Sequence, residues 1–208
     1  MTKALEFTDD GLLRRMMAGD EEAFTLLYRR RHPAIYRFAL HMSGNAAVAE
    51  DVTQEVFMTL IRDATRFDPA RGTLGGYLFG VARNLVRRRW EQERNSFPLP
   101  PEGEHLPPHG AGAGVSGDGR TRNGSGRAED EFASFETVGR VRQAVATLPA
   151  NYREVVVLCE FEEMSYEEAA DALDCPIGTV RSRLHRARAL LVEKLRESRP
   201  VRRAAVGE

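Results

Sequence analysis

A stretch rich in glycine and proline near the middle of the chain constrains its folding more than any other feature. Eight of the eighteen glycines and five of the ten prolines lie between Pro98 and Gly126. This stretch has almost no periodic apolar content, so it cannot bury enough surface to offset the entropy lost on ordering it. We predict a disordered linker over residues 95–134, with an r.m.s. span of roughly 35 Å. The alternative, an ordered functional loop, is uncommon at this length inside a compact domain.

The linker divides the 208-residue chain into two predicted domains, residues 1–94 and 135–197, followed by a basic tail at 198–208. Apolar residues in both domains recur with the period of a helix, and strand signals are few. The β-branched run Val155–Leu158 has no hairpin partner or flanking turn, so we interpret it as a buried helix. The sequence therefore predicts an all-α protein of two small helical domains. The expected helices span about 9–18, 20–30, 33–43, 47–64, 74–93, 136–147, 150–160, 165–173 and 177–197.

The formal net charge of -1 conceals a strong segregation of charge along the chain. Residues Glu154–Asp174 include eight acids and no Lys or Arg, whereas Arg181–Arg203 contains nine basic residues and only two acids. Residues Arg62–Arg94 hold eight arginines and four acids. Such segregation favours electrostatic steering toward a polyanion such as nucleic acid. The same runs are also compatible with ordinary solvated helix faces.

Several classes of protein are disfavoured by the sequence. The N-terminus lacks a secretory signal and no apolar stretch is long enough to cross a bilayer, so we expect no membrane insertion and a cytoplasmic location. Neither the two cysteines, Cys159 and Cys175, nor the histidines show the spacing of metal ligands. No nucleotide-binding loop or nucleophile with an oriented base is present. We therefore expect no enzyme activity, no bound metal and no cofactor.

The C-terminal domain contains the pattern of a helix-turn-helix. Ser165 begins a capping box that ends at Glu168, and the segment Asp174-Cys175-Pro176 then breaks the helix. Proline suits the first turn of the basic helix that follows. A short helix, a tight break and a basic second helix together are typical of this DNA-binding motif.

The phase of the second helix predicts a recognition surface. At 100° per residue, one face collects the apolar side chains Val180, Leu184, Ala187 and Leu191. Arg181, Ser182, His185 and Arg186 share the opposite face, where side chains near the helix N-terminus can reach base edges. We add Thr179 to this surface and expect Arg183 and Arg188, on its flanks, to contact phosphate. The alternative is a surface helix with solvated arginines.

The segment LPANYREVVVLCEFEEMSYEEAADALDCPIGTVRSRLHRARALL resembles the DNA-binding region four of bacterial sigma factors of the extracytoplasmic-function (ECF) group. The resemblance implies that Arg181, Ser182, His185 and Arg186 read the −35 promoter element. It also implies that the acidic helix before the motif faces the β flap of RNA polymerase. Cys159 is then a core residue and Cys175 a turn residue.

The helix expected at 47–64 has a broad apolar face, formed by Val48, Val52, Val56, Phe57, Leu60 and Ile61. Asp51, Gln54 and Glu55 share the opposite face, which on composition alone is simply solvated. The segment AEDVTQEVFMTL, however, resembles the sigma segment that docks on the clamp of the polymerase β′ subunit. The resemblance implies that these three residues bind core RNA polymerase.

The helix expected at 74–93 and the residue just after it place Arg83, Arg87 and Arg94 on one stripe, with Trp90 at its edge. A basic stripe beside an aromatic ring can bind phosphates and stack unpaired bases, although an exposed basic helix with a half-buried Trp is equally compatible. FDPARGTLGGYLFGVARNLVRRRW resembles the sigma segment that melts and holds the −10 element, with Tyr77 in place of the usual Trp. The resemblance makes Phe67–Thr73 the loop that receives a flipped base. The implied −10 contacts are Phe67, Arg71, Thr73, Tyr77, Arg83, Asn84, Arg87 and Trp90.

The resemblance predicts a dissociable sigma factor of the ECF type, with core RNA polymerase, promoter DNA and an anti-sigma factor as partners. Two rival hypotheses remain. A self-sufficient helix-turn-helix regulator would explain the C-terminal domain but would leave the Asp51 face without a role. A protein-interaction adaptor would use the helices to bind a regulator and would have no active DNA contacts.

Overall fold

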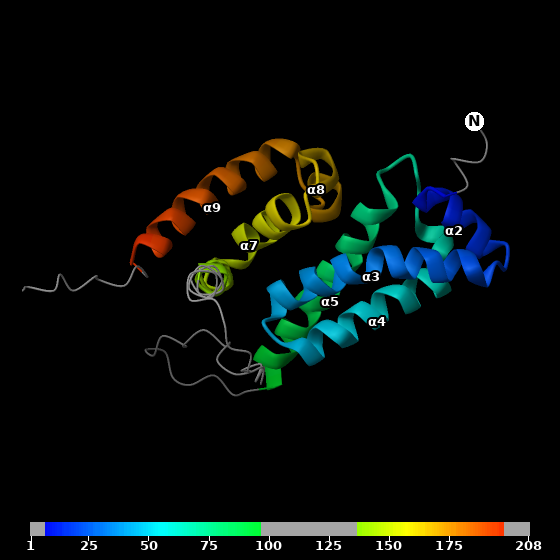
Figure 1. Cartoon of the computed structure of the whole chain (residues 1–208), viewed down its shortest axis with the longest axis horizontal. Helices are drawn as coiled ribbons and strands as arrows, with labels where there is room; N and C mark the ends of the chain where they lie inside the picture. Colours follow the sequence, from blue (N-terminus) through cyan, green and yellow to red (C-terminus); the bar gives the residue numbers. More distant parts are fainter. Residues whose placement is uncertain (1–6, 97–136, 198–208) are drawn as a thin grey trace, which may run out of the picture.

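The computed structural model describes residues 7–96 and 137–197, and all regular structure within these ranges is helical. The helices form two groups that lie side by side (Figure 1). The predicted all-α fold with two helical groups is therefore confirmed. The predicted linker and the predicted tail lie outside the described residues, except for residues 95 and 96, which belong to the last helix of the first group.

The N-terminal group contains the helices α2 (Asp9–Met17), α3 (Glu21–Ser43), α4 (Ala46–Asp63) and α5 (Leu74–Ser96), with a 3₁₀ turn, η1 (Ala64–Arg66). Polar side chains begin three of these helices, because Thr8, Asp20 and Asn45 each accept a hydrogen bond from a first-turn amide. Apolar side chains of all four helices meet in the core, where Leu12, Leu27, Phe38, Val52, Leu60 and Leu78 are completely buried.

Helix α3 corrects one prediction. We expected separate helices at about 20–30 and 33–43. Proline generally disfavours a helix interior. The structure instead has one helix of 23 residues with Pro33 inside it. Both halves bury one continuous apolar stripe, and the stacked rings of His32 and Tyr36, 6.3 Å apart, cross the proline position. Tertiary packing thus overrides the local preference of proline.

The C-terminal group begins with a helix at 137–146, followed by α7 (Ala150–Val156), α8 (Tyr166–Leu173) and α9 (Ile177–Glu197). The residues after α7 continue as one π-helical segment, η2 (Val157–Phe161), rather than as the regular helix expected to residue 160. Val155–Leu158 is buried, as predicted. The capping box of Ser165 and Glu168 is present, and Asp174 ends α8 in the left-handed conformation.

The two groups pack directly on each other. Helix α5 lies against α8, and α3 lies against α7 and η2. Arg153 joins the groups, because its guanidinium donates a 2.9 Å hydrogen bond to the carbonyl oxygen of Met42 at the end of α3. His41 adds a ring contact with Phe161, with a centroid separation of 4.9 Å. The predicted functional surfaces must therefore be considered within this docked arrangement.

Candidate nucleic-acid and partner interfaces

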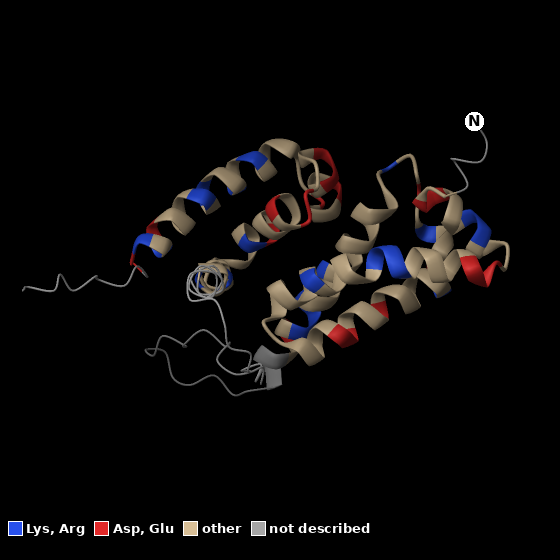
Figure 2. Ribbon diagram, viewed as in Figure 1, with Lys and Arg blue, Asp and Glu red and all other residues tan. Residues whose placement is uncertain are grey.

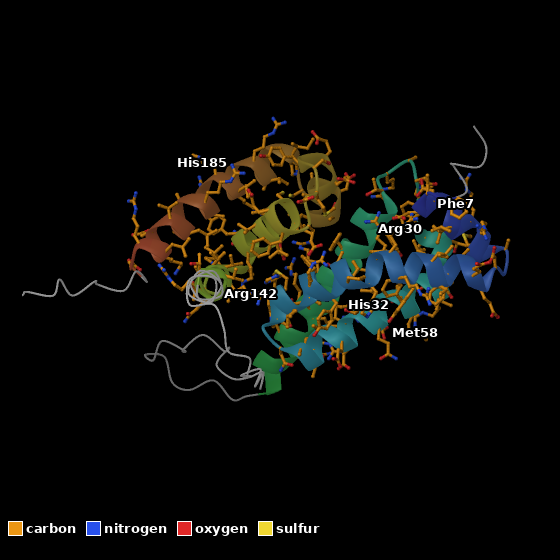
Figure 3. All side chains as sticks on the ribbon, in the orientation of Figure 1. Phe7, Arg30, His32, Met58, Arg142 and His185 are labelled. Atoms are coloured by element: carbon orange, nitrogen blue, oxygen red, sulfur yellow. The ribbon has the colours of Figure 1, made fainter. Side chains whose placement is uncertain are left out.

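The recognition helix has the predicted phase. Val180, Leu184 and Ala187 are buried against the rest of the C-terminal group, whereas Arg181, Ser182, His185 and Arg186 are exposed on α9. Thr179 and Arg183 are half-buried at the border between the two faces. Basic segments recur along α9 in Figure 2, and His185 is labelled on it in Figure 3. The structure thus brings these predicted residues together on one helix.

Two local interactions organise the start of this surface. The guanidinium carbon of Arg181 lies 5.8 Å from the centre of the Tyr166 ring, which links α9 to the first helix of the motif. The hydroxyl of Ser182 donates a 3.1 Å hydrogen bond to the carbonyl oxygen of Thr179. Arg188, further along, is held by a 3.0 Å contact with Glu160, which raises the pKa of the guanidinium.

Three predicted −10 residues have structural contacts that sequence reasoning missed. Phe67 is buried, and its ring lies 5.7 Å from the ring of half-buried Tyr77. Burial, with nearby Asp63 adding to it, raises the pKa of Tyr77. The hydroxyl of Thr73 accepts a 3.1 Å hydrogen bond from the amide of Gly76 and so caps α5. The pattern of Thr three residues before Gly76 is a capping signal that the sequence contained.

The residues of the predicted basic stripe of α5 differ in their exposure to solvent. Asn84 and Arg87 are exposed, and Trp90 is half-buried against the core. Arg83, by contrast, has a side chain only 15% exposed, and its Nε atom lies 2.9 Å from a carboxylate oxygen of Glu154. This Nε makes no well-aligned hydrogen bond, so the contact is an ion pair. The sequence carried no signal for a partner 71 residues away.

A groove of about 680 Å³ separates the loop before α5 from the turn after α8. Exposed Arg71 lines one side, and Asp171 and Asp174 line the other. Asp171 closes over the loop, because its Oδ2 atom lies only 2.6 Å from the position that a Cβ atom would take on Gly72. The predicted base-receiving loop therefore faces acidic side chains of the C-terminal group.

The predicted polymerase-binding residues lie together on the outer side of α4. Asp51, Gln54 and Glu55 are all exposed, and Asp51 forms a 3.1 Å ion pair with Arg89 of α5. The same helix exposes half of the Met58 side chain, which Figure 3 labels. Ile61 is 52% exposed, although we expected it on the buried face. An exposed strip of acidic and apolar side chains is a suitable surface for a protein partner.

The acidic segment of the C-terminal group faces the N-terminal group in part. Both carboxylate oxygens of Glu162 contact the guanidinium of Arg37, at 3.0 Å and 2.5 Å, and the Glu162 side chain is 3% exposed. Burial raises the pKa of Glu162, and this effect exceeds the opposing effect of Arg37. The hydrogen bond to Glu162 in turn raises the pKa of Arg37. Glu154 and Glu162 therefore each have an arginine of the N-terminal group as the partner of their buried carboxylate.

The cysteines form no disulfide and no metal-ligand cluster is found in the described ranges. Cys159 and Cys175 are both free and half-buried. Burial raises the pKa of the Cys159 thiol to about 11, which suits a packed side chain rather than a reactive one. No group of three metal-ligating side chains occurs within residues 7–96 and 137–197. None of the helices described there is long and apolar enough to span a membrane.

Comparison with known families assigns both helical groups. The sequence profile of sigma-70 region 2 matches residues 27–96, and that of sigma-70 region 4 matches residues 139–191. The ECF RNA polymerase sigma-E factor of Escherichia coli K12 is 30% identical, over 91% of this chain and 95% of that protein. The chain belongs to the ECF group of sigma factors. As a sigma factor it is a subunit that binds core RNA polymerase, recognises promoter elements and promotes DNA melting.

Two further relatives support the assignment. The ECF RNA polymerase sigma factor SigE of Mycolicibacterium smegmatis is 32% identical over 81% of this chain, which spans 60% of that longer protein. The sigma factor RpoE of Bartonella quintana, solved in complex with the anti-sigma factor NepR, shares the fold with a TM-score of 0.56 and 25% identity. That match covers 85% of this sigma factor and 98% of RpoE. Below, region two denotes helices α2–α5, and region four denotes residues 137–197.

Proposed function

We propose that this sigma factor reads the −35 element with α9 and holds the −10 element with α5 and the loop before it. The observation that carries the −35 assignment is the exposed face of Arg181, Ser182, His185 and Arg186, opposite a buried apolar stripe. These side chains lie in the first turns of the second helix of a helix-turn-helix, where major-groove readout takes place. Arg183 and Thr179, which are half-buried at the border, would contact phosphates.

The proposed −10 residues fall into an exposed set and a packed set, and the two sets would have different roles. Exposed Arg71, Asn84 and Arg87 would contact the DNA backbone and bases directly, because they are open to solvent. Phe67, Thr73 and Tyr77 would shape the loop that receives a flipped base, since Phe67 packs on Tyr77 and Thr73 caps α5. Trp90 would stack on DNA at the far end of α5. Arg83 would contact DNA only after its ion pair with Glu154 is broken.

Asp51, Gln54 and Glu55 would bind the clamp of the β′ subunit, with Met58 and Ile61 adding apolar area to the contact. The acidic side of α7 and η2 would bind the β flap. A protein with these roles carries out no bond chemistry of its own and works in the cytoplasm with its polymerase. The fold shared with RpoE bound to NepR supports an anti-sigma factor as the regulating partner.

A run-off transcription assay with purified components tests this function. Core RNA polymerase from a bacterium that encodes this chain is mixed with the protein and a library of random promoter sequences. Specific initiation that depends on the protein is the expected result, and the selected promoters then define both elements. Absence of initiation on every promoter would refute the sigma function. A footprint on duplex DNA without polymerase would favour the self-sufficient regulator instead.

A further inference from the structure

Four side chains join η2, α8 and α9 at the recognition surface of region four. Glu160 belongs to η2, Tyr166 is the first residue of α8, and Arg181 and Arg188 belong to α9. The guanidinium carbon of Arg181 lies 5.8 Å from the centre of the Tyr166 ring. The Nε and Nη2 atoms of Arg188 donate to one carboxylate oxygen of Glu160, at 3.0 Å and 2.5 Å. Both arginines are exposed, so these contacts orient guanidinium groups that DNA can reach.

The Tyr166 ring is held in place by groups other than the two arginines. It is half-buried and packs against the hydrophobic core. Tyr166 directly follows Ser165, whose capping box with Glu168 fixes the first turn of α8. The contact with Glu160 and, to a smaller extent, the Tyr166 side chain raise the pKa of Arg188. Tyr166 therefore lies beside both arginines as a fixed support.

The helix geometry places the two arginines at different positions along the DNA. Seven positions of an α-helix separate Arg181 from Arg188, which amounts to about 10 Å along the axis and a rotation within about 20° of two full turns. Successive base pairs are about 3.4 Å apart, so the two side chains cannot serve the same base pair. An arginine that moves freely loses rotamer entropy when it binds, and one that is already oriented loses less.

We propose that Tyr166 and Glu160 are positioning residues for DNA binding by α9, with the Tyr166 ring orienting Arg181 and the Glu160 carboxylate orienting Arg188. Both act through the arginines rather than by touching DNA. Glu160 accepts from two of the five N–H groups of the Arg188 guanidinium, so the others can donate to a phosphate. This inference rests on the proposed −35 role of α9.

A double-mutant cycle between Tyr166 and Arg181 tests the first contact in the reconstituted holoenzyme. The measurement is the affinity for a labelled duplex that carries the selected −35 element, followed by fluorescence anisotropy. Tyr166→Leu removes the aromatic ring and should weaken binding by about fivefold in the original protein, but should have no further effect in the Arg181→Ala protein. Tyr166→Phe keeps the ring and should bind within about twofold of the original protein.

A pair of substitutions at Glu160 tests the second contact. Glu160→Gln and Glu160→Ala remove the same negative charge, but only glutamine keeps an oxygen that can accept from Arg188. Glu160→Ala should therefore bind the −35 duplex about threefold to fivefold more weakly than Glu160→Gln. The difference between the two should vanish in the Arg188→Ala protein. Equal affinities of Glu160→Ala and Glu160→Gln in the original protein would overturn the positioning role of Glu160.

The outcomes separate the positioning role from the −35 role on which it rests. Full loss by Tyr166→Leu in the Arg181→Ala protein would show that Tyr166 acts independently of Arg181, and would overturn the proposal. Equal losses by Tyr166→Leu and Tyr166→Phe would do the same. Affinity for core polymerase should be unchanged in every variant, and a loss of it in Tyr166→Leu would make the role of the ring structural. Unchanged −35 affinity in both Arg181→Ala and Arg188→Ala would instead refute the −35 role of α9 itself.

Discussion

Removal of the Ser165 hydroxyl is a direct test of how region four is built. The Oγ atom of Ser165 accepts a 3.1 Å hydrogen bond from the amide of Glu168, and a Glu168 carboxylate oxygen accepts one of 3.0 Å from the amide of Ser165. Ser165→Ala removes the first bond and leaves the second possible. Helix α8 has eight residues, too few to persist without its cap and its packing.

The expected loss follows from the exposure of the site. Ser165 is exposed, so water can hydrogen-bond the freed amide of Glu168 and the loss should be about 1 kcal/mol, in the middle of the range for helix caps. For a chain of this size, such a loss lowers the melting temperature by about 2–4 °C. With a urea slope of about 2 kcal/mol/M, the unfolding midpoint falls by about 0.5 M. Urea titration followed by far-UV circular dichroism measures it.

Ser182→Ala is the matched control, because it removes the same hydroxyl from the interior of a helix. The Ser182 hydroxyl bonds only a carbonyl of the preceding turn, and alanine has the higher helix propensity. Its stability should therefore stay the same or rise slightly, while its affinity for the −35 element falls. Equal destabilisation by both substitutions would refute the assignment of the effect to the helix cap. Ser165→Thr, which keeps a hydroxyl, should lie close to the original protein.

Four other outcomes are expected. Arg186→Ala should weaken binding to the selected −35 sequence by about 1–3 kcal/mol and relax its specificity, measured by transcription from promoter variants. Asp51→Arg should weaken binding to core polymerase by about tenfold in a fluorescence titration, with promoter preference unchanged. Because burial raises the pKa of Cys159 from an ordinary 9.0 to about 11, its alkylation at pH 8 should be about 100-fold slower in the folded than in the unfolded chain. Burial, with Arg142 and Arg37 adding to it, lowers the pKa of His41 from 6.5, so the unfolded chain takes up this proton first. The free energy of unfolding should fall as the pH drops from about 7 to 5.5, and His41→Gln should remove that part of the slope.

Each of these outcomes has a result that contradicts it. Equal loss of binding on all promoters would make Arg186 a phosphate contact rather than a base contact. Glu50→Arg, the same charge change about 100° around α4, should affect core binding less than Asp51→Arg, and equal effects would remove the Asp51 face from the interface. Rapid alkylation of Cys159 in the folded chain would contradict its burial. An unchanged pH slope in His41→Gln would assign the slope to other groups.

The accuracy of the sequence-based predictions depended on how local each feature is. The buried and exposed faces of α9 were predicted correctly, because the side chains of one helix face are set by a period of 3.6 residues. The capping box was predicted for the same reason, since its two residues are three positions apart. The separate helices at 20–30 and 33–43 were a wrong prediction, because the packing that keeps α3 continuous comes from other helices. Ile61 was also assigned to the core, although it lies about 100° around α4 from buried Leu60 and is 52% exposed.

The sequence alone determined most of the helices, most of their exposed faces and the resemblance that identifies a sigma factor, because these depend on residues close together in the chain. Only the tertiary structure decided which acid meets which arginine. Glu162 meets Arg37 across 125 positions, and Glu154 meets Arg83 across 71. Periodicity cannot select one partner among eight acids in the segment Glu154–Asp174, because the choice depends on how two separate helical groups dock. Which arginines of the proposed DNA-binding surface are paired with acids is therefore decided by the tertiary structure.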